Sequence, residues 1–413
     1  MADPAATERP VLVVGAGPVG MTAALALRTR GLPVTVLESG AKDRVRPGSR
    51  ALFVHRQSLK LLEGAHPGLG RRIASYGTTW RTRRTLYRGR QVFARTYPEA
   101  PETADSGGEG RLPAFASLRQ VDTERFLYEA CLEAGVDFRF DAEVTGVETT
   151  GTEVTLTAED GDSWTAAHAI AADGARSGVR RALDIPLEGT RSDGYHVVVD
   201  VADPAGGELS AERVFHYEHP AAGGRTVLRV PFTGGFQIDL QCRADDPPGT
   251  YDTEQAVRRW LPRLVGADCA HHVLWVSRYH FLRKVAASFT DPAGRVLLAG
   301  EAAHLFPPFG ARGMNSGIAD AVAAADAISV ACSDPSRAPV AIGEFASTRR
   351  RAALFNSVAA GAALDHMRPR RWGRVTQRAA ATLAPVVPRC GAWLEHAPYG
   401  PRGGPMADAA RKY

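Results

Sequence analysis

The clearest hydrophobic pattern of the chain lies near its start. Residues 11–14 are all apolar, which is typical of a strand covered on both faces of a parallel sheet. A glycine-rich turn over residues 15–20 follows, and the alanine- and leucine-rich stretch that runs to about Arg30 predicts a helix that Gly31 ends. A second apolar strand is predicted over residues 34–38. These elements together predict a strand–helix–strand unit with short loops.

The next stretch has a weaker pattern. Residues 41–115 are rich in arginine, glycine and proline, and we expect loops there together with one helix over residues 57–63. An amphipathic helix is predicted over residues 121–134, because its apolar side chains recur on one face. Short strands then predict a β-meander over residues 138–140, 144–148 and 153–157.

The alternation of apolar and polar residues changes again between residues 195 and 279. Many glycines and the lack of a strong helix, except near residues 253–264, predict an inserted antiparallel sheet that forms a second lobe. Residues 295–299 predict another buried strand, and a glycine-rich turn and a long helix over residues 316–331 follow it. The remainder of the chain is predicted to be helical, with interruptions at prolines.

Composition excludes several classes of protein. Hydrophobic residues make up 44% of the chain and charged residues 23%, as in ordinary globular proteins. The net charge is only +5, and we interpret the basic run over residues 81–90 as a solvated face, because no nucleic-acid-binding module accompanies it. The five cysteines are widely spaced and argue against a disulfide framework or a metal site. Without a secretory core, or an uninterrupted apolar run approaching the ~20 residues that span a bilayer, a cytoplasmic protein is expected.

The glycine turn carries the first candidate chemistry. Gly15 allows the tight turn, Gly17 lets a pyrophosphate approach the backbone, and Gly20 lets the helix pack closely on the strand. Free N–H groups and the positive end of the helix dipole then face the phosphates. Glu38 ends the second strand 18 residues after Gly20, where a carboxylate can accept both ribose hydroxyls. We interpret this unit as a dinucleotide site; the alternative is a tight turn beside an exposed glutamate.

Two later motifs distinguish FAD from NAD. They are Ala172-Asp173-Gly174-Ala175-Arg176-Ser177-x-Val179-Arg180 and Gly300-Glu301-Ala302-Ala303-His304. Together with the glycine turn they resemble the motifs of the group A flavoprotein monooxygenases, the aromatic hydroxylases similar to p-hydroxybenzoate hydroxylase. The resemblance runs from about residue 10 to at least residue 345, in the family's order and approximate spacing.

The resemblance implies an α/β fold in which a Rossmann-like FAD-binding domain carries an inserted antiparallel β-sheet substrate lobe and C-terminal helices. We expect the first part of the FAD-binding domain over residues 1–180 and its second part, with the flavin loop, over residues 286–350. The substrate lobe is expected over residues 181–285 and a helical segment over residues 351–413.

The resemblance also implies a set of cofactor contacts. Glu38 would hold the adenosine ribose, Arg50 would lie by the pyrophosphate, and the strand at Val144 would meet the adenine. Asp173 belongs to the motif associated with the use of both FAD and NAD(P)H, and residues 307–317 would wrap the isoalloxazine. The other residues implied to bind FAD are Gly15, Gly17, Pro18, Val19, Gly20, Gln120, Glu301, Ala311, Gly313, Met314 and Asn315.

One implied contact departs from the family pattern. The family usually has aspartate where this chain has Glu301, and that carboxylate accepts a hydrogen bond from the ribityl chain. A different rotamer or a small shift of the chain must absorb the extra methylene, so we expect FAD binding to survive with altered affinity or positioning. Arg312, in the flavin loop, is expected to add a fixed positive charge that raises the reduction potential of the flavin.

The implied activity is aromatic hydroxylation. NADPH or NADH would reduce the flavin, O2 would form a flavin C4a-hydroperoxide, and oxygen would pass to a small phenolic or polyketide-like substrate. The sequence does not identify the catalytic base. The candidates are the backbone carbonyl of Pro307 and the side chains of Tyr217, His216 and Tyr279, with Tyr195, His196 and His280 also in the second lobe.

Two alternatives stay open at this point. One is an FAD-dependent dehydrogenase or reductase, and the other is a protein that binds FAD without catalysis. Whatever the reaction, we expect a monomer or a homodimer that binds neither nucleic acid nor a membrane.

Overall fold

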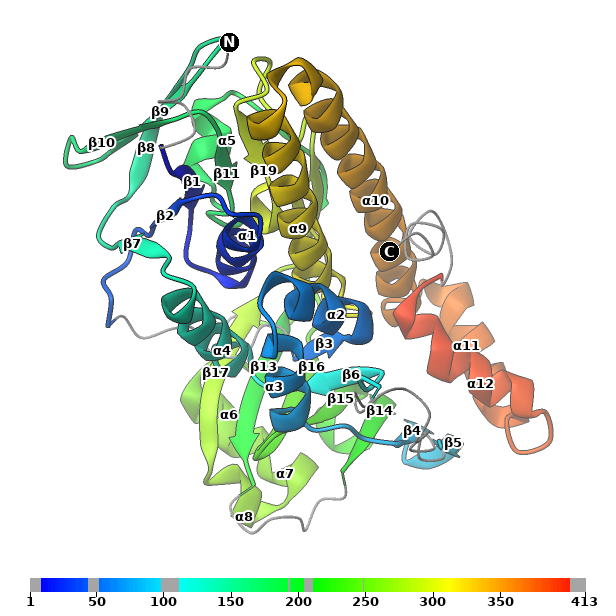
Figure 1. Cartoon of the computed structure of the whole chain (residues 1–413). Coiled ribbons are helices and arrows are strands. Elements are labelled where there is room, and N and C mark those ends of the chain that lie inside the picture. Colours follow the sequence, from blue (N-terminus) through cyan, green and yellow to red (C-terminus); the bar gives the residue numbers. More distant parts are fainter. Residues whose placement is uncertain are drawn as a thin grey trace.

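The fold is mixed α/β and is built around two large sheets, so the predicted fold class is confirmed (Figure 1). The structure is a computed structural model that describes residues 9–43, 52–97, 111–191, 194–203, 211–247 and 249–401.

A parallel sheet of five strands, in the order β19-β11-β1-β2-β7, forms the centre of the first lobe. Val13 of β1 lies opposite Val36 of β2 on one side and Ile170 of β11 on the other. All four residues of β1 are buried, which explains their uninterrupted apolar run. The strands are β1 (Val11–Val14), β2 (Val34–Leu37), β7 (Asp137–Arg139), β11 (Ala169–Ala171) and β19 (Val296–Leu298).

Helix α1 (Pro18–Thr29) begins directly after the glycine turn and packs against α9 (Arg312–Ser333). The two helices approach closely because a side chain at Gly317 would lie only 2.4 Å from Cγ2 of Val19. Helix α10 (Ala338–Met367) runs beside α9 in the gold and brown part of Figure 1. Within the described ranges, α9 alone is long and apolar enough to cross a membrane, but 56% of its apolar window is buried inside the protein. Its contacts are those of a core helix.

The strand predicted at residues 138–140 exists as β7, but its predicted place in a meander is wrong. β7 pairs in parallel with β2 and forms an edge of the five-stranded sheet. The antiparallel meander consists of β8 (Val144–Thr149), β9 (Val154–Ala158) and β10 (Ser163–Ala166). A three-residue strand carries too little periodicity to indicate which strand it pairs with.

The second lobe contains a sheet of seven strands in the order β17-β13-β16-β15-β14-β4-β5. On one face, apolar side chains of its central strands pack against three short helices, α6 (Glu254–Trp260), α7 (Pro262–Val265) and α8 (Ala267–Ala270). The other face turns toward the first lobe. The strands are β4 (Thr82–Tyr87), β5 (Arg90–Thr96), β13 (His196–Ala202), β14 (Glu212–His219), β15 (Arg225–Phe232), β16 (Gly235–Gln241) and β17 (Val273–Tyr279).

Strands β4 and β5 come from a segment predicted as loops, so that prediction is wrong for residues 82–96. β4 pairs in parallel with β14, which places Arg83 opposite Arg213. The arginines of β4 make the segment look like a polar loop in the sequence. In the fold, Arg84 forms an ion pair with Glu212, which lies 128 residues later in the sequence. The sheet therefore takes strands from outside residues 181–285, and the domain boundaries stay predictions.

The remaining elements connect and flank the two sheets. The C-terminal part of the chain is helical, as predicted. Its helix α12 (Pro388–His396) approaches β5 closely at Gly391, where a side chain would lie 2.0 Å from the carbonyl oxygen of Val92. These elements are β3 (Phe53–His55), α2 (Arg56–Ala65), α3 (Leu69–Tyr76), β6 (Phe115–Ser117), α4 (Gln120–Glu133), α5 (Gly178–Ala182), β12 (Leu187–Arg191), η2 (Pro220–Ala222), β18 (Leu282–Ala286), η3 (Gly300–Ala302), β20 (His304–Leu305), η4 (Pro335–Arg337), α11 (Arg371–Leu383), α12 (Pro388–His396) and η5 (Ala397–Tyr399).

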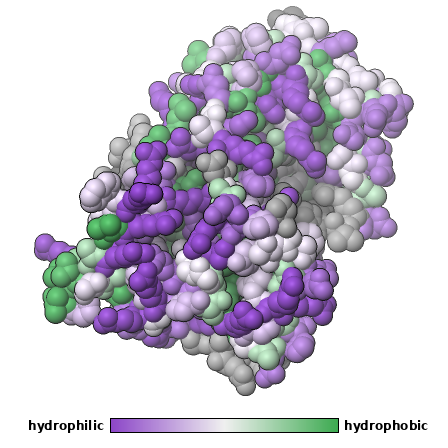
Figure 2. Space-filling view, turned by 180° about the vertical axis from the view of Figure 1, so that it is seen from behind, coloured by the Kyte–Doolittle hydropathy of each residue, from purple (hydrophilic) through white to green (hydrophobic). Residues whose placement is uncertain are grey.

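The surface is mostly polar in the view of Figure 2, with a group of hydrophobic side chains at its lower left edge, where α11 and α12 lie. Exposed apolar side chains of these two helices and the loop between them include Trp372, Val375, Leu383 and Val386.

Candidate active site

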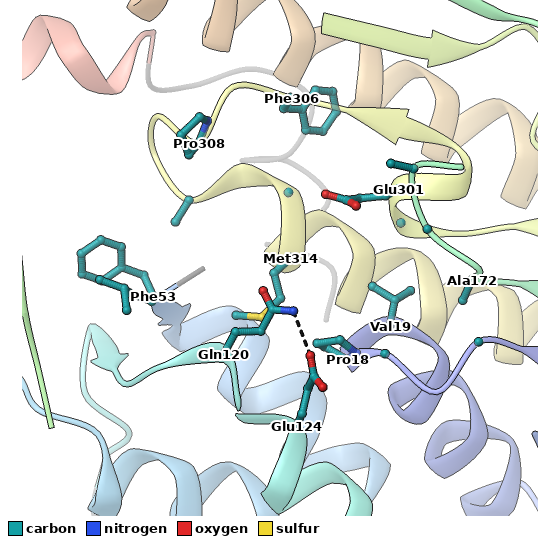
Figure 3. A pocket seen from close by; sticks show the side chains of 18 of the residues that line it. Pro18, Val19, Phe53, Gln120, Glu124, Ala172, Glu301, Phe306, Pro308 and Met314 are labelled. Atoms are coloured by element: carbon teal, nitrogen blue, oxygen red, sulfur yellow. Dashed lines mark hydrogen bonds between the residues drawn. The ribbon is translucent and has the colours of Figure 1, made fainter. Parts of the chain in front are cut away.

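A cavity of about 1260 Å³ lies between the two lobes. The glycine turn, the start of α4 and the start of α9 line one part of it, and the free face of the seven-stranded sheet lines another. Figure 3 shows Gln120, Glu301 and Met314 reaching into this space from three different elements. One cavity thus joins the predicted cofactor residues to the second lobe.

The glycine turn has the geometry of an anion cradle. Gly15 has a φ of +99°, and a side chain there would lie 2.6 Å from the carbonyl oxygen of Ala172. A side chain at Gly20 would lie 1.9 Å from the carbonyl oxygen of Gly15, so neither position admits a larger residue. Gly17 lines the cavity and has open space where its side chain would be. The backbone at the start of α1 is therefore accessible to a phosphate group.

The carboxylate of Glu38 is held in place beside the glycine turn. It is 6% exposed, lines the cavity, and accepts hydrogen bonds from the backbone N–H of Ala16 at 2.7 Å and of Gly40 at 2.9 Å. Two backbone donors orient the group before any ligand binds. This arrangement fits the predicted ribose contact.

Three further predicted residues line the same part of the cavity. Gln120 donates a hydrogen bond from Nε2 to Oε1 of Glu124 at 2.9 Å, the dashed line in Figure 3. Val144 lies at the start of β8. Asp173 accepts a hydrogen bond from the N–H of Val179 at 3.1 Å, and burial raises the pKa of Asp173 above its ordinary value. The predicted contact Arg50 lies outside the described residues.

The predicted flavin loop is held rigidly at the start of α9. Ala311 has a φ of +53° and directly precedes the helix. The side-chain amide of Asn315 donates to the carbonyl oxygen of Phe53 and accepts from the N–H of His55, at 2.8 and 2.9 Å. Ala311, Gly313 and Met314 line the cavity, whereas Asn315 and Gly20 support its wall from behind. A side chain at Gly313 would meet open space, as at Gly17.

The guanidinium of Arg312 is held by the C-terminal part of the chain and does not line the cavity, so its predicted effect on the flavin stays a prediction. It donates to Oδ1 of Asn356 at 2.7 Å and to the carbonyl oxygens of Tyr399 and Pro401 at 3.1 and 3.2 Å. It is not among the residues that line the cavity. Arg312 therefore fastens the C-terminal segment to the start of α9.

None of the four predicted catalytic candidates lines the cavity. Pro307 is buried between two lining residues, Phe306 and Pro308. Tyr217 donates to the carbonyl oxygen of Leu394 at 2.7 Å, inside an apolar cluster. His216 accepts from the N–H of Gly89, and Tyr279 packs at the edge of the same cluster as Tyr217.

A buried ion cluster lies at the end of the cavity formed by β4 and β14. Arg213 is 2% exposed, and its Nη2 donates to Oε1 of Glu395 at 2.6 Å and to the hydroxyl of Tyr399. Burial opposes the charge of Arg213, but Tyr399 and Glu395 together raise the pKa of Arg213 above its ordinary value. Arg83 lies 5.6 Å from the ring centroid of Tyr399 and 4.0 Å from Glu395. Two cations thus share one buried carboxylate, which leaves this end of the cavity positive.

Sequence reasoning missed this cluster. Its members lie on β4, β14, α12 and η5, which are far apart in the sequence, so no local motif marks them. The alternation of side chains along β14 could have indicated the cluster, because this alternation places the charged Arg213 on the same face as the apolar Phe215 and Tyr217.

The middle of the cavity is apolar. Three aromatic rings pack edge to face or tilted, with Phe53 5.8 Å from Trp80 and Trp80 4.8 Å from Phe115. Leu228 and Val230 of β15 also line the cavity, and Phe53 packs in the same small cluster as these two residues. Such a lining with a few polar groups is typical of a site for an aromatic small molecule. Within the described ranges, no group of three or more metal-binding side chains is present.

The fold and the site together define a class of protein: a dinucleotide-binding flavoprotein in which the cofactor turn opens into a cavity under a second sheet. The chain belongs to the FAD binding domain family, whose model matches residues 8–352. Within it, the chain is a member of the group A aromatic monooxygenases, as the resemblance of its motifs predicts, and its cofactor is FAD.

Several known proteins similar to this chain are monooxygenases. A flavin-dependent monooxygenase of Mycobacteroides abscessus is 28% identical over 318 residues, which cover 75% of this chain and 65% of that protein. A rifampicin monooxygenase of Rhodococcus hoagii is 27% identical, with 75% and 62% covered. The chain therefore spans just under two thirds of the length of these relatives. The crystal structure of p-nitrophenol 4-monooxygenase from Pseudomonas putida superposes with a TM-score of 0.75 at 25% identity, covering 94% and 93%.

Proposed function

We propose that this protein is an FAD-dependent monooxygenase that uses NADPH or NADH and O2 to hydroxylate a small aromatic molecule. One observation carries the proposal: a single cavity joins the glycine turn and the start of α9 to an apolar wall with a positively charged end. A simple dinucleotide-binding protein needs only the first part of that cavity. The second part has the size and lining that a ring-shaped substrate requires.

The residues present fit FAD. Gly17 and Gly313 leave open backbone at the starts of α1 and α9, where the N–H groups of a helix favour negative charge. Glu38 would hold the ribose, and Gln120, Val144 and the other predicted cofactor residues would contact the rest of the molecule. Bound FAD supplies the redox chemistry, taking a hydride from NAD(P)H and passing one oxygen atom of O2 to the ring.

The chain itself would bind and orient the substrate and keep water away. The rings of Phe53, Trp80 and Phe115 would lie against an aromatic substrate and leave little room for water, which protects the oxygen-transfer step from side reactions. Arg213 and Arg83 would hold an electron-rich substituent at the positive end. A cytoplasmic location, the choice between NADPH and NADH, and a monomeric or homodimeric state stay predictions.

Labelled oxygen tests the proposal. The FAD-loaded protein is mixed with NADPH or NADH, a panel of phenols and ¹⁸O2, and we expect at least one phenol to accelerate NAD(P)H oxidation and to acquire one ¹⁸O atom. Flavin reduction without label in any product would favour a dehydrogenase or reductase. No reduction by either nicotinamide would favour a protein that binds FAD without catalysis.

A further inference from the structure

Among the described residues of the second lobe, Asp239 is the acidic side chain that lines the cavity. It lies on β16, where Gln237 and Asp239 face the cavity and Ile238 and Leu240 face the opposite core. The other carboxylates among the lining residues belong to segments of the first lobe, near the predicted FAD contacts: Glu38, Glu124, Glu143, Asp173 and Glu301.

A fully buried histidine holds this carboxylate. His196 on β13 is 0% exposed, and its Nδ1 lies 2.7 Å from Oδ1 of Asp239. An ionised carboxylate can only accept, so Nδ1 of His196 carries the hydrogen and donates it. The ring is fixed between aromatic side chains, with ring centroids 4.2 Å from Phe281 and 6.0 Å from Phe309. Because the imidazole ring of His196 cannot rotate freely, it holds the carboxylate of Asp239 in one orientation. The position of the second carboxylate oxygen is therefore fixed as well.

An apolar strip separates Asp239 from the positive end of the cavity. Across the sheet, Asp239 pairs with Leu228, and Leu228 pairs with Phe215, two residues beyond Arg213 on the same strand. Neighbouring strands are about 4.8 Å apart, so β16 and β14 are separated by roughly 10 Å. One aromatic ring with a substituent at each end fits between a hydrogen-bond acceptor and a cation at this spacing.

We propose that Asp239 is a catalytic residue that accepts the proton of the substrate's ring hydroxyl, and that His196 is its positioning residue. This inference rests on the proposed function. In the step, the O–H bond breaks, the electron pair stays on the phenol oxygen, and the proton forms a carboxylic acid at Asp239. The ring becomes more nucleophilic toward oxygen transfer. On rearomatisation the ring carbon loses its own proton, which leaves with the second oxygen atom of O2 as water. Asp239 then returns its proton to the product oxygen and is a carboxylate again.

The alternatives on this face are less suitable. Gln237 donates to Oδ1 of Asp200 and cannot take a proton. Other charged or titratable side chains also lie on this face of the sheet. Among the described residues they are His196 and Asp200 on β13, Arg213 and Tyr217 on β14, Arg83 and Tyr87 on β4, Arg95 on β5 and Tyr279 on β17. None of these combines a carboxylate with a position in the cavity wall.

A coloured phenol tests the proposal without turnover. 4-Nitrophenol and its anion absorb at different wavelengths, so titration of the complex with FAD-loaded protein reports the pKa of the bound probe. A carboxylate acceptor favours the neutral hydroxyl, and we expect the wild-type protein to raise the pKa of the probe above its value in water. Asp239→Asn should lower the bound value by about one pKa unit or more, a tenfold change in the ratio of the two forms. Asp239→Glu should restore part of the shift.

Two outcomes would overturn the proposal. They are an equal probe pKa in the wild-type protein and the Asn variant, and absence of probe binding by the wild-type protein. Glu129→Gln, a change on the exposed face of α4, serves as the control that leaves binding unchanged. Flavin absorbance and thermal unfolding of each variant establish that it is folded and loaded.

A kinetic comparison separates this inference from the function on which it rests. With any phenol that acquires labelled oxygen, Asp239→Asn should lower kcat at least tenfold with a smaller change in KM, and His196→Gln should give an intermediate loss. If no phenol acquires oxygen but the probe shift depends on Asp239, the proposed function fails while the proton contact stands. If oxygen is transferred equally by the wild-type protein and the Asn variant, Asp239 is not catalytic.

Discussion

The carboxylate of Glu395 on α12 accepts a hydrogen bond at 2.6 Å from Nη2 of Arg213 on β14, 182 residues earlier in the sequence. Neither side chain has more than 3% exposure, and the second oxygen of Glu395 accepts a hydrogen bond from the hydroxyl of Thr85 at 2.6 Å. The family model ends at residue 352, so a segment beyond it completes the cavity wall. This segment therefore contributes to the site as well as to stability.

Replacing Glu395 should destabilise the fold. Glu395→Gln leaves the buried guanidinium of Arg213 without its carboxylate, and breaking a buried pair in this way costs about 3–5 kcal/mol of unfolding free energy. Urea unfolding of the wild-type protein and the variant measures the loss.

Two matched changes support the interpretation of that experiment. Glu129→Gln removes the exposed i,i+4 pair with Arg125, where the partners are 43% and 47% exposed, and should cost less than about 0.5 kcal/mol. The double variant Arg213→Met, Glu395→Leu contains neither charge and should recover much of the stability. Equal losses for Glu395→Gln and Glu129→Gln would contradict a buried ion pair.

Gly17 and Gly20 should respond differently to alanine. A methyl group at Gly17 would enter open cavity space, and the φ of −81° suits any residue, so Gly17→Ala should fold normally. It should weaken FAD binding at least about tenfold, or about 1.4 kcal/mol, because the methyl group keeps the pyrophosphate from the backbone. Flavin fluorescence titration of the apoprotein measures the affinity.

Gly20→Ala is the comparison for that variant. Its methyl group would collide with the carbonyl oxygen of Gly15 at 1.9 Å, so the apoprotein itself should lose about 1–3 kcal/mol of stability. Full FAD affinity in Gly17→Ala would show that the cofactor does not lie over this turn.

The sequence predicted those parts of the site in which local geometry and chemistry coincide. Gly15, Gly17 and Gly20 lie within one turn, and their steric requirements follow from the strand and helix on either side. The loop before α9 was predictable for the same reason. Val11–Val14 indicated a buried strand because burial on both faces leaves no polar positions.

The second lobe was less predictable because its contacts are non-local. β4 appears polar until Glu212 and Tyr399 are brought beside its arginines by pairing with β14 and by the return of the C-terminal segment. Asp239 shows the same difficulty. Alternation predicts that it shares a face with Gln237, but only the fold determines that this face lines the cavity and that His196 lies behind it.

Acid should destabilise the fold through His366, whose side chain is buried beside Tyr217. Burial lowers the pKa of His366 from 6.5 to about 4, and its Nε2 shares a hydrogen bond of 2.9 Å with the hydroxyl of Tyr217. The unfolded chain binds a proton at this histidine below pH 6.5, whereas the folded protein does not until about pH 4, so stability falls as the pH decreases through this window. The contribution, up to about 3 kcal/mol, is fully present above pH 6.5.

A comparison of two pH profiles isolates this histidine from the others. His366→Gln cannot be protonated, so its unfolding free energy should fall less than that of the wild-type protein between pH 6.5 and pH 4. Urea unfolding at intervals across the window gives both curves. Parallel curves would mean that His366 titrates normally in the folded protein.

Glu301→Asp should strengthen FAD binding. The extra methylene of Glu301 could be absorbed by a shift of the chain or by a different rotamer, and the structure favours the rotamer. The N–H of Gly300 donates to Oδ2 of Asp320 at 3.1 Å, and a side chain at Gly317 would lie 3.2 Å from Cα of Gly300, so the backbone has little room to move.

Because the chain is clamped there, Glu301 must fold its longer side chain within the cavity, where Figure 3 shows it. Ordering the additional rotatable bond costs conformational entropy that aspartate avoids. We therefore expect Glu301→Asp to slow FAD release by about threefold to tenfold, up to about 1.4 kcal/mol. Flavin fluorescence after dilution of the loaded protein measures the rate, and Glu129→Asp on the surface should leave it unchanged. Unchanged release from Glu301→Asp would show that the glutamate holds the cofactor as well as the aspartate that is usual in the family.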